Sequence, residues 1–395
     1  MIYDPSQLSA IESASNLKNR ISLVTGGAGS GKTTVIKSIL DKLGDCELMS
    51  PTGKAAARMA EVTGRDASTI HRALGFNGEI WMRKKWFDKP VIIDEASMID
   101  SMLMAKILDY KPQKLILVGD DSQLEPVGRG CPFKDLIRII PESVSRLTVC
   151  HRAKGAIHKA SQAIRAGQAP LMSDQADGES FKMINTGDAT ATTAKLLKWV
   201  TDGYYKPETD MILSPRYGAG SEENDGGIDS LNREIKAIIN PSLGKLAVKD
   251  RIIVTKNHAD IGPSGIWNGD LGFITDIDSA GRPEITLDRD KKNNGDDPVL
   301  IQIGKDEVKD IRLAYAMSVH KAQGSEAEHV FVIVLKNHFY QLNRSLIYTA
   351  VTRAKKATVV MGQMSAFYQG INKTSEKKTI LQYLGRNKKH VSSIL

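Results

Sequence analysis

The stretch "ISLVTGGAGSGKTT" (residues 21–34) decides the fold of this chain. Residues 21–25 are mostly apolar or β-branched and predict a short buried strand. Residues 26–34 fit the pattern G-x-x-x-x-G-K-[ST], and a helical pattern continues over 32–43. A glycine-rich turn between a strand and a helix directs backbone N–H groups at phosphate oxygens. The stretch therefore predicts an α/β domain that binds a nucleoside triphosphate.

Lys32 and Thr33 are the side chains of this turn with a predicted chemical role. The Lys32 ammonium would neutralise the β- and γ-phosphates of ATP, and the Thr33 hydroxyl would bind Mg²⁺. The predicted phosphate-binding residues are Gly26, Gly27, Ala28, Gly29, Ser30, Gly31, Lys32, Thr33 and Thr34. A chance glycine-rich turn is the alternative. The pattern indicates a nucleotide but leaves the reaction open.

Two further strand ends supply polar side chains. "VIIDEAS" (91–97) places Asp94 and Glu95 directly after an apolar strand. Asp94 is where Mg²⁺ needs an anchoring carboxylate, and Glu95 is placed to act as a general base toward water. "LVGDDSQLEP" (117–126) ends a third buried strand, and its Gln123 could orient the lytic water or detect the γ-phosphate. A solvated polar turn is the alternative for both motifs.

The composition is that of a globular protein, with 25% charged and 41% hydrophobic residues. The formal net charge of +8 favours a polyanionic partner. Three scattered cysteines provide neither a disulfide framework nor a zinc pattern. No apolar run approaches the roughly 18 residues of a membrane span, and the N-terminus lacks the pattern of a secretory signal. We therefore expect a cytoplasmic protein without a membrane partner.

Strand and helix patterns divide the chain into two α/β domains and two insertions. Buried strands that alternate with helices indicate parallel sheets wrapped by helices. A segment with two tryptophans and a basic cluster predicts a small β-hairpin in the first domain, and strands separated only by turn residues predict a small β-barrel in the second. The predicted bounds are 1–71 and 90–142 for the first domain, 72–89 for the hairpin, 143–243 and 313–395 for the second domain, and 244–312 for the barrel.

The motifs follow one another in a characteristic order. They are "SQLSAIE" (6–12), "GGAGSGKTT" (26–34), "SPTGKAAARM" (50–59), "STIHRALG" (68–75), "IIDEASMID" (92–100), "LVGDDSQLEPV" (117–127), "CHRAKG" (150–155), "AYAMSVHKAQGSEAEHVFVIV" (314–334) and "IYTAVTRAKK" (347–356). This order resembles the superfamily 1 DNA helicases, and most of all their RecD/Dda-like branch. The resemblance implies two RecA-like P-loop domains and an ATP-driven helicase that moves 5′ to 3′ on single-stranded DNA.

The resemblance assigns further residues to the nucleotide. Arg353 in "TAVTRAKK" (349–356) and Arg152 in "CHRAKG" match arginines of the family that act on the γ-phosphate from the second domain. Guanidinium donors stabilise the charge that develops on a transferred phosphoryl group. For Arg353, a surface salt bridge is the alternative. Gln7 matches the residue that reads the adenine edge. Residues expected near the nucleotide are also Gln323, Gly324 and Glu326.

The family's contacts to the DNA strand match residues on loops that follow sheet strands. These are Thr52, Lys54, Ser68, Thr69, His71, Ser318, His320 and Lys321. Hydroxyls and lysines beside helix N-termini suit phosphates, whereas a structural role is the alternative for the two histidines. Trp81 and Trp86 in "IWMRKKWFD" (80–88) are aromatics among cations, which suits base stacking at a duplex junction. Packing as the hairpin's own small core is the alternative for the two tryptophans.

The expected partners are single-stranded DNA and forked duplex DNA, with replication, recombination or repair proteins as further candidates. The resemblance favours a monomeric motor in a bacterial or phage-infected cytoplasm. An ATPase clamp or translocase that does not separate strands is the alternative function. The two functions differ in whether residues 75–89 are exposed where they could meet a duplex.

Overall fold

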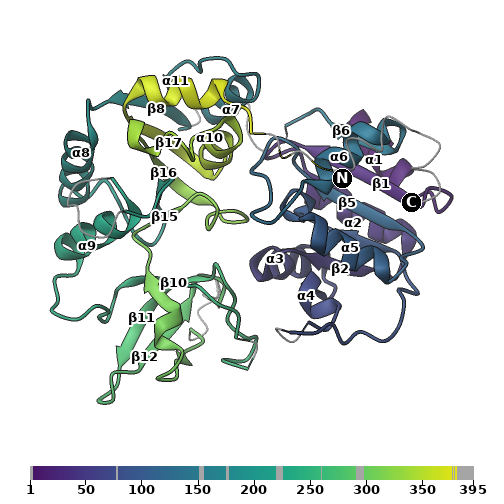
Figure 1. Ribbon diagram of the computed structural model, residues 1–395, viewed down its shortest axis with the longest axis horizontal. Coiled ribbons are helices and arrows are strands. Elements are labelled where there is room, and N and C mark those ends of the chain that lie inside the picture. The colour runs from purple at the N-terminus through teal and green to yellow at the C-terminus, as the bar shows by residue number, and fades with distance from the viewer. Residues whose placement is uncertain are drawn as a thin grey trace. The chain divides into compact units, whose positions relative to one another are not determined.

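The computed structural model describes residues 3–76, 79–150, 155–174, 178–218, 226–258, 260–290, 298–375, 377 and 379. The chain divides into two compact units (Figure 1), which are Met1–Lys154 with Ser375–Leu395, and Gly155–Thr374. Each unit contains its own sheet with helices on both sides. The predicted α/β class is therefore confirmed.

The sheet of the first unit has six strands. They are β1 (Ile21–Gly26), β2 (Glu47–Ser50), β3 (Ala67–Thr69), β4 (Val91–Ile93), β5 (Leu115–Gly119) and β6 (Val144–Leu147), in the order β3-β2-β4-β5-β1-β6 with all neighbours parallel. The helices are α1 (Pro5–Ser15), α2 (Lys32–Leu43), α3 (Gly53–Thr63), α4 (Ile70–Ala73), α5 (Ser101–Asp109) and α6 (Pro132–Ile139). Successive strand residues enter different core clusters, as Leu117 and Val118 do. The sheet is thus buried on both faces, which explains its continuous apolar strands.

The sheet of the second unit also has six strands. They are β7 (Ser173–Asp174), β8 (Ser180–Asn185), β9 (Met211–Ser214), β15 (Ala316–Ser318), β16 (Ala327–Val334) and β17 (Ala354–Gly362), in the order β15-β9-β16-β17-β8-β7. All pairs are parallel except β7 with β8. The helices are α7 (Ala156–Arg165), α8 (Ala189–Thr201), α9 (Ile228–Ile239), α10 (Arg344–Val351) and α11 (Met364–Asn372). Figure 1 shows α8 and α9 on one side of this sheet and α7, α10 and α11 on the other.

A separate antiparallel sheet lies between α9 and β15 in the sequence. Its strands are β10 (Arg251–Val254), β11 (Leu271–Ile277), β12 (Pro283–Leu287), β13 (Ile301–Gln302) and β14 (Ile311–Leu313), in the order β13-β12-β11-β10-β14. It has its own apolar core, which includes Ile252, Ile285 and Ile311. The structure therefore contains an all-β segment where the sequence predicts one, whereas closure of this sheet into a barrel stays a prediction.

Asp250 connects the antiparallel sheet to the rest of the second unit. Its carboxylate is fully buried and accepts from the Tyr315 hydroxyl at 3.0 Å and from Asn240 Nδ2 at 2.8 Å. It also forms an ion pair with Lys236 on α9. A buried charge with this many donors holds its neighbours in one arrangement, because loss of any donor would leave part of the charge unpaired. The antiparallel sheet is consequently attached rigidly where the chain enters it.

The boundary between the two units differs from the prediction at residue 143. Strand β6 pairs with β1, from Leu23 with Val144 to Gly26 with Leu147, so it belongs to the first sheet. The chain also returns to the first unit at its C-terminal end. There Lys377 Nζ donates to backbone carbonyls of residues 126–128, and the Thr379 hydroxyl donates to the buried Asp135 carboxylate. The second unit is therefore shorter at both ends than the predicted domain.

The hairpin expected over residues 72–89 stays a prediction. A single antiparallel bridge joins Phe76 to Trp81, and residues 77–78 lie outside the described part of the chain. The segment that follows is fixed by Arg83, whose guanidinium donates to Ala73 O at 3.1 Å and to the Glu47 carboxylate at 2.9 Å.

Short 3₁₀ turns complete the secondary structure. They are η1 (Ala96–Met98), η2 (Pro141–Ser143), η3 (Asp288–Asp290), η4 (Val308–Asp310) and η5 (Lys336–His338). Among the described residues, no helix is both long and apolar enough to cross a membrane.

Candidate nucleotide and nucleic-acid sites

The phosphate loop joins β1 to α2 and depends on glycine. Gly29 and Gly31 have φ angles of 76° and 79°, a region that disfavours residues with a Cβ. A Cβ at Gly26 would lie 2.5 Å from Ser30 Oγ and 2.8 Å from Leu147 Cβ. These constraints close the loop around the N-terminus of α2, where unpaired N–H groups favour an anion.

Lys32 is held across this loop. Its ammonium donates to Gly26 O at 2.8 Å and to Gly27 O at 3.0 Å. Lys32 and Thr33 are both partly exposed, so the ammonium and the hydroxyl stand beside the helix N-terminus within reach of a ligand. This combination of a cation, a hydroxyl and N–H donors fits a phosphate group and its metal ion.

Asp94 and Glu95 follow β4, as predicted. The Asp94 N–H donates to Met49 O at 3.0 Å, and the Asp94 carboxylate accepts from the Glu95 N–H at 2.8 Å. Burial, together with the neighbouring Glu95 carboxylate, raises the pKa of Asp94 to about 6, against the opposing effects of the Glu95 N–H and of Lys32. Glu95 lies in the left-handed region at φ 54°, which is strained for a residue with a side chain. Strain of this kind concentrates at functional sites.

Several buried polar atoms at this edge of the sheet have no hydrogen-bond partner in the described structure. They are Ser30 Oγ, Ser50 Oγ, Glu95 Oε2, Ser97 Oγ and Gln123 Oε1. Native proteins rarely leave such atoms unpaired without a functional reason. The orphaned oxygens follow β1, β2, β4 and β5, and the carboxyl ends of parallel strands meet at one edge. The residues predicted from three separate motifs are therefore gathered at one site that suits ATP with Mg²⁺.

Gln7 is buried against the phosphate loop. Its Oε1 accepts from the Asp4 N–H at 3.3 Å, and its Nε2 donates to Ser30 O at 3.3 Å. Asp4 also caps α1, and together the two residues form a capping box. The sequence analysis missed this arrangement, although the Asp4–Gln7 spacing is a recognised helix-start signal. Recognition of adenine by Gln7 stays a prediction.

Arg353 lies in the second unit, in the turn between α10 and β17. Its side chain is 5% exposed. The guanidinium donates to Thr349 O at 3.0 Å, Ser325 O at 3.3 Å and Thr352 Oγ1 at 3.3 Å. In the described part of the chain it forms no ion pair with a carboxylate. The surface salt bridge that the sequence left open is therefore wrong.

The other predicted residues around Arg353 have different surroundings. Gln323 is 8% exposed and its Nε2 lacks a partner among the described residues, whereas Gly324 has a φ of 73°. Lys355 Nζ lies 3.8 Å from the Glu326 carboxylate. Arg152 lies outside the described residues.

Two neighbouring loops of the first unit carry predicted DNA contacts. Thr52 Oγ1 accepts from the Ala55 N–H at 3.3 Å and caps α3, with Lys54 in the first turn. Thr69 Oγ1 accepts from the Arg72 N–H at 3.2 Å and caps α4. Ser68 lies beside it on β3 and donates to Thr69 O at 3.4 Å. Because β2 and β3 are adjacent and parallel, these loops lie side by side. The hydroxyls thus serve as helix caps, and their contact with DNA stays a prediction.

The two tryptophans of residues 79–88 differ in their environment. Trp81 is partly buried and stacks on His71, with ring centroids 5.5 Å apart and an interplanar angle of 23°. Burial lowers the pKa of His71, so its imidazole is neutral at pH 7. Trp86 is 63% exposed, with Lys111 Nζ 4.3 Å from its ring centroid. Trp81 therefore packs against the apolar core of the first unit, whereas Trp86 is available to a ligand.

Ser318, His320 and Lys321 follow β15 in the second unit. The Ser318 hydroxyl accepts from the Lys321 N–H at 3.3 Å, and Lys321 Nζ contacts the Asn268 side chain of the antiparallel sheet. His320 is exposed. Burial lowers the pKa of Lys321, and the nearby Arg312 lowers it further.

Lys321 lines a cavity of about 1190 Å³ between α9 and the antiparallel sheet. Its lining contains six Lys or Arg residues and one carboxylate, Asp229. Three cations of this lining form no ion pair within the described part of the chain, namely Arg233, Lys309 and Arg312. The sequence analysis missed these three cations, because they lie on α9, η4 and β14 and meet only in the folded unit. Their charge makes the cavity suitable for a phosphate backbone.

The fold and these sites define a P-loop protein with two RecA-like units, the architecture of superfamily 1 helicases. Residues 2–186 match the AAA domain family, and residues 313–361 match the UvrD-like helicase C-terminal domain family. Over most of its length the chain is similar to the RecD-like branch of the superfamily 1 helicases.

Two relatives illustrate this similarity. The ATP-dependent RecD2 DNA helicase of Deinococcus radiodurans is 32% identical over 371 residues, which cover 88% of this chain and 48% of the relative. The RecBCD enzyme subunit RecD of Mycolicibacterium smegmatis is 28% identical over 416 residues, which cover 93% of this chain and 72% of the relative. The chain thus spans about half the length of the RecD2 relative.

Solved structures of Pif1 helicases share the fold. The Candida albicans Pif1 helicase aligns with a TM-score of 0.56 at 19% identity and covers 100% of this chain and 99% of its own. The Bacteroides Pif1 helicase in complex with ADP-AlF3 and single-stranded DNA aligns with a TM-score of 0.54 at 19% identity, with 99% and 98% covered. At this identity, the likeness concerns the fold alone.

Proposed function

We propose that this chain is an ATP-dependent DNA helicase that uses Mg²⁺, moves 5′ to 3′ along single-stranded DNA and separates duplex ahead of it. The observation that carries the proposal is Arg353, a 5% exposed guanidinium in the second unit that has no carboxylate partner among the described residues. A buried cation without a counter-charge is costly in a purely structural role. A γ-phosphate supplies the missing negative charge.

The residues of the first unit have matching roles in the proposed hydrolysis. Lys32 and the N–H groups of the loop bind the β- and γ-phosphates, and Thr33 with Asp94 holds the metal ion. Mg²⁺, when bound, neutralises phosphate charge. Glu95 removes a proton from the attacking water, and its unpaired Oε2 is the atom that accepts it. Gln123 orients this water through its unpaired Oε1.

Arg353 completes the proposed reaction from the second unit. Its guanidinium stabilises charge that develops on the γ-phosphoryl group, which hydrolysis requires and nucleotide binding does not. Because the phosphate loop and Arg353 belong to different units, turnover needs the two units to close on ATP. This requirement is how ATP hydrolysis would drive movement along a strand.

The proposed path of the strand in the second unit includes the basic cavity. Arg233, Lys309 and Arg312 offer charges to successive phosphates, and Lys321 stands between this cavity and β15. Contacts of this kind bind any sequence and weaken as salt increases. They suit a motor that must bind and release each nucleotide in turn.

Strand separation would depend on the aromatic side chains of residues 79–88. The favourable feature is Trp86, an exposed aromatic near Lys84 and Lys85. The unfavourable feature is that Trp81 packs against His71, so one aromatic rather than two is available. This second feature favours a DNA-stimulated translocase without strand separation as the alternative function.

Stopped-flow unwinding of matched duplexes tests the proposal. The duplexes carry a 5′ single-stranded tail, a 3′ tail or no tail, and ATP starts the reaction. We expect strand separation only with the 5′ tail. Separation only with the 3′ tail would contradict the proposed direction. DNA-stimulated ATP hydrolysis without separation of any duplex would leave the translocase as the function.

The proposed working form is a monomer that cooperates with replication or recombination proteins. Unwinding rates measured over a range of protein concentrations at fixed DNA test the first part. A rate per bound molecule that is constant with concentration is expected, and a second-order dependence would contradict a monomeric motor.

A further inference from the structure

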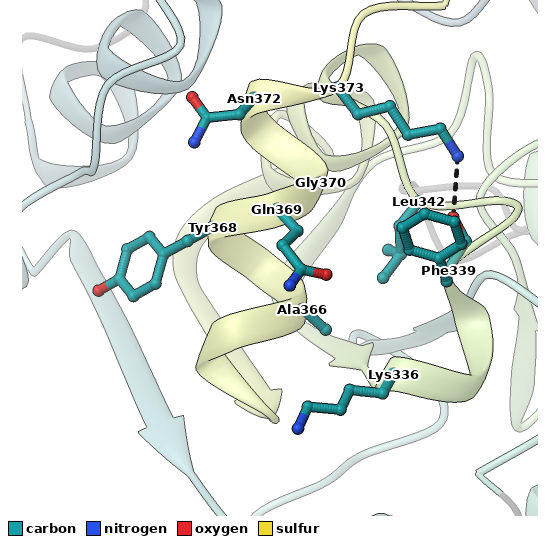
Figure 2. A pocket seen from close by; sticks show the side chains of 9 residues that line it. All are labelled: Lys336, Phe339, Leu342, Ala366, Tyr368, Gln369, Gly370, Asn372 and Lys373. Atoms are coloured by element: carbon teal, nitrogen blue, oxygen red, sulfur yellow. Dashed lines mark hydrogen bonds between the residues drawn. The ribbon is translucent and has the colours of Figure 1, made fainter.

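A second pocket lies on the surface of the second unit, where η5 and the residues after it face helix α11 (Figure 2). Its volume is about 470 Å³, within the range of protein pockets that bind ligands. Figure 2 shows Lys336 and Lys373 toward opposite ends of the pocket, with Phe339 and Leu342 on the side that faces α11. None of the residues assigned to ATP or DNA lines this pocket.

The part of the α11 wall around Ala366 and Gly370 is close-packed and apolar, and it is bordered by the polar side chains of Gln369 and Asn372. A Cβ at Gly370 would lie 2.6 Å from Ile347 Cδ1, so this helix packs tightly against the unit at that point. Ala366 contributes only a methyl group to the same wall. The pocket therefore has a firm apolar floor that an apolar side chain could fill.

Exposed aromatic side chains gather around the pocket. Phe339 is 51% exposed, Tyr340 86% and Tyr368 39%. Aromatics are enriched at the centre of protein–protein interfaces, and single buried anchors carry much of the binding energy there. The arrangement is typical of a docking site for a protein segment.

The charge of this region selects the partner. The lining of the pocket contains two lysines, Lys336 and Lys373, and no carboxylate. Lys336 Nζ has no hydrogen-bond or ion-pair partner among the described residues, whereas Lys373 Nζ donates to Phe339 O at 2.9 Å and Tyr340 O at 3.3 Å. A partner with carboxylates would therefore meet cations and no like charge.

A protein segment fits this pocket better than nucleic acid does. The Phe339 ring, the aromatic group that lines the pocket beside Lys373, has the Lys373 ammonium 4.6 Å from its centroid. The ammonium occupies one face of the Phe339 ring, and Tyr368, the other aromatic side chain of the lining, points away from Phe339 in Figure 2. The lining therefore offers no pair of facing rings between which a base could stack. A narrow apolar floor with a cation at each end instead suits one apolar side chain flanked by carboxylates.

We propose that this pocket docks a short acidic segment of a partner protein, with one apolar side chain on the floor beside Gly370 and carboxylates against Lys336 and Lys373. The segment would recruit or retain the enzyme at DNA that the partner occupies. This role is separate from hydrolysis and strand separation, so it goes beyond the proposed function.

Fluorescence anisotropy with the full chain tests the proposal. The probes are four fluorescein-labelled hexapeptides of Asp and Glu that end in Phe, Leu, Ile or Trp. Control peptides carry Asn and Gln in place of the acids, or Ser in place of the apolar residue. We expect at least one acidic peptide to bind saturably and each control change to weaken binding by about tenfold or more.

Three variants locate the binding site. Lys336→Glu and Gln369→Glu place a negative charge at the pocket, and both residues are exposed enough to tolerate it. Lys305→Glu makes the same charge change as Lys336→Glu on an exposed turn of the antiparallel sheet. We expect the two pocket variants to weaken peptide binding by about tenfold and the control variant by less than about twofold. DNA-stimulated ATP hydrolysis should be unchanged in all three.

Three results would overturn the proposal. The first is the absence of saturable binding by any of the four peptides. The second is equal weakening by the Lys305→Glu control, which would indicate non-specific attraction to the net charge. The third is a combination of two observations: an oligothymidylate displaces the peptide, and the Lys336→Glu variant binds the oligonucleotide more weakly than the wild type. Together they would make the pocket a nucleic-acid site. A failure of strand separation would leave all three readouts unaffected.

Discussion

Replacement of Arg353 by Met separates a structural role of the guanidinium from a catalytic one. The side chain keeps its length but loses every donor and its charge. Thr349 O still accepts from the Thr352 hydroxyl at 3.0 Å, so the substitution removes a donor chiefly from Ser325 O. Loss of one donor to a buried acceptor costs at most about 1–3 kcal/mol, and removal of a buried charge offsets part of this cost.

The expected catalytic effect is much larger than this structural cost. An arginine that acts on the transferred phosphoryl group contributes about 10³–10⁵-fold in rate, or roughly 4–7 kcal/mol of transition-state stabilisation. The variant should therefore remain folded at 25 °C, bind ATP with an affinity within several-fold of the wild type, and hydrolyse it orders of magnitude more slowly.

Three measurements on the same preparation check this prediction. They are thermal unfolding, binding of a fluorescent ATP analogue, and steady-state ATP hydrolysis with and without an oligothymidylate. Arg353→Lys serves as the matched control, because it keeps the positive charge but not the planar set of donors. The smallest fall in turnover that a catalytic role predicts is about 10³-fold. If turnover of the folded Arg353→Met variant falls by less than about tenfold, Arg353 acts only through packing.

Three further predictions concern other parts of the chain. Lys32→Ala should abolish ATP hydrolysis, whereas Glu95→Gln should bind ATP but hydrolyse it slowly. Near-normal turnover by Glu95→Gln in a phosphate-release assay would mean that another residue acts as the general base. Replacement of residues 80–87 by a Gly-Ser turn should preserve DNA-stimulated hydrolysis and strongly reduce unwinding, and an equal loss of both in paired assays would mean that the segment is structural. Lys114→Met should lower the free energy of unfolding in urea by about 2–4 kcal/mol, because the buried ammonium donates to two backbone carbonyls and to the Ser22 hydroxyl. An unchanged urea midpoint of unfolding would show that these acceptors find other donors.

The nucleotide site of the first unit was accessible from the sequence because its signals are local. The phosphate loop and the Asp94–Glu95 pair each follow an apolar strand, and parallel topology brings strand ends together without further information. Even the glycines of the loop could be assigned from one pattern. The structure adds the unpaired oxygens of Glu95 and Gln123, which no sequence pattern reports.

The missed features depend on residues far apart in the chain. Strand β6 is only partly buried and weakly apolar, and its pairing with β1 identifies it. The burial of Trp81 depends on His71 and Phe76, which fold back onto it. The basic cavity likewise combines α9 with strands of the inserted sheet. Spacing along the sequence carries no record of such contacts.

The return of the chain to the first unit has a consequence for biosynthesis. Lys377 and Thr379 dock on residues 126–128 and Asp135, which the ribosome delivers more than two hundred residues earlier. The first unit can form its sheet during synthesis, but it gains these last contacts only after the second unit has emerged. A nascent chain therefore carries an incompletely buried Asp135 for most of its time on the ribosome, and a premature stop after Thr374 would leave a protein with both sheets but without this final attachment.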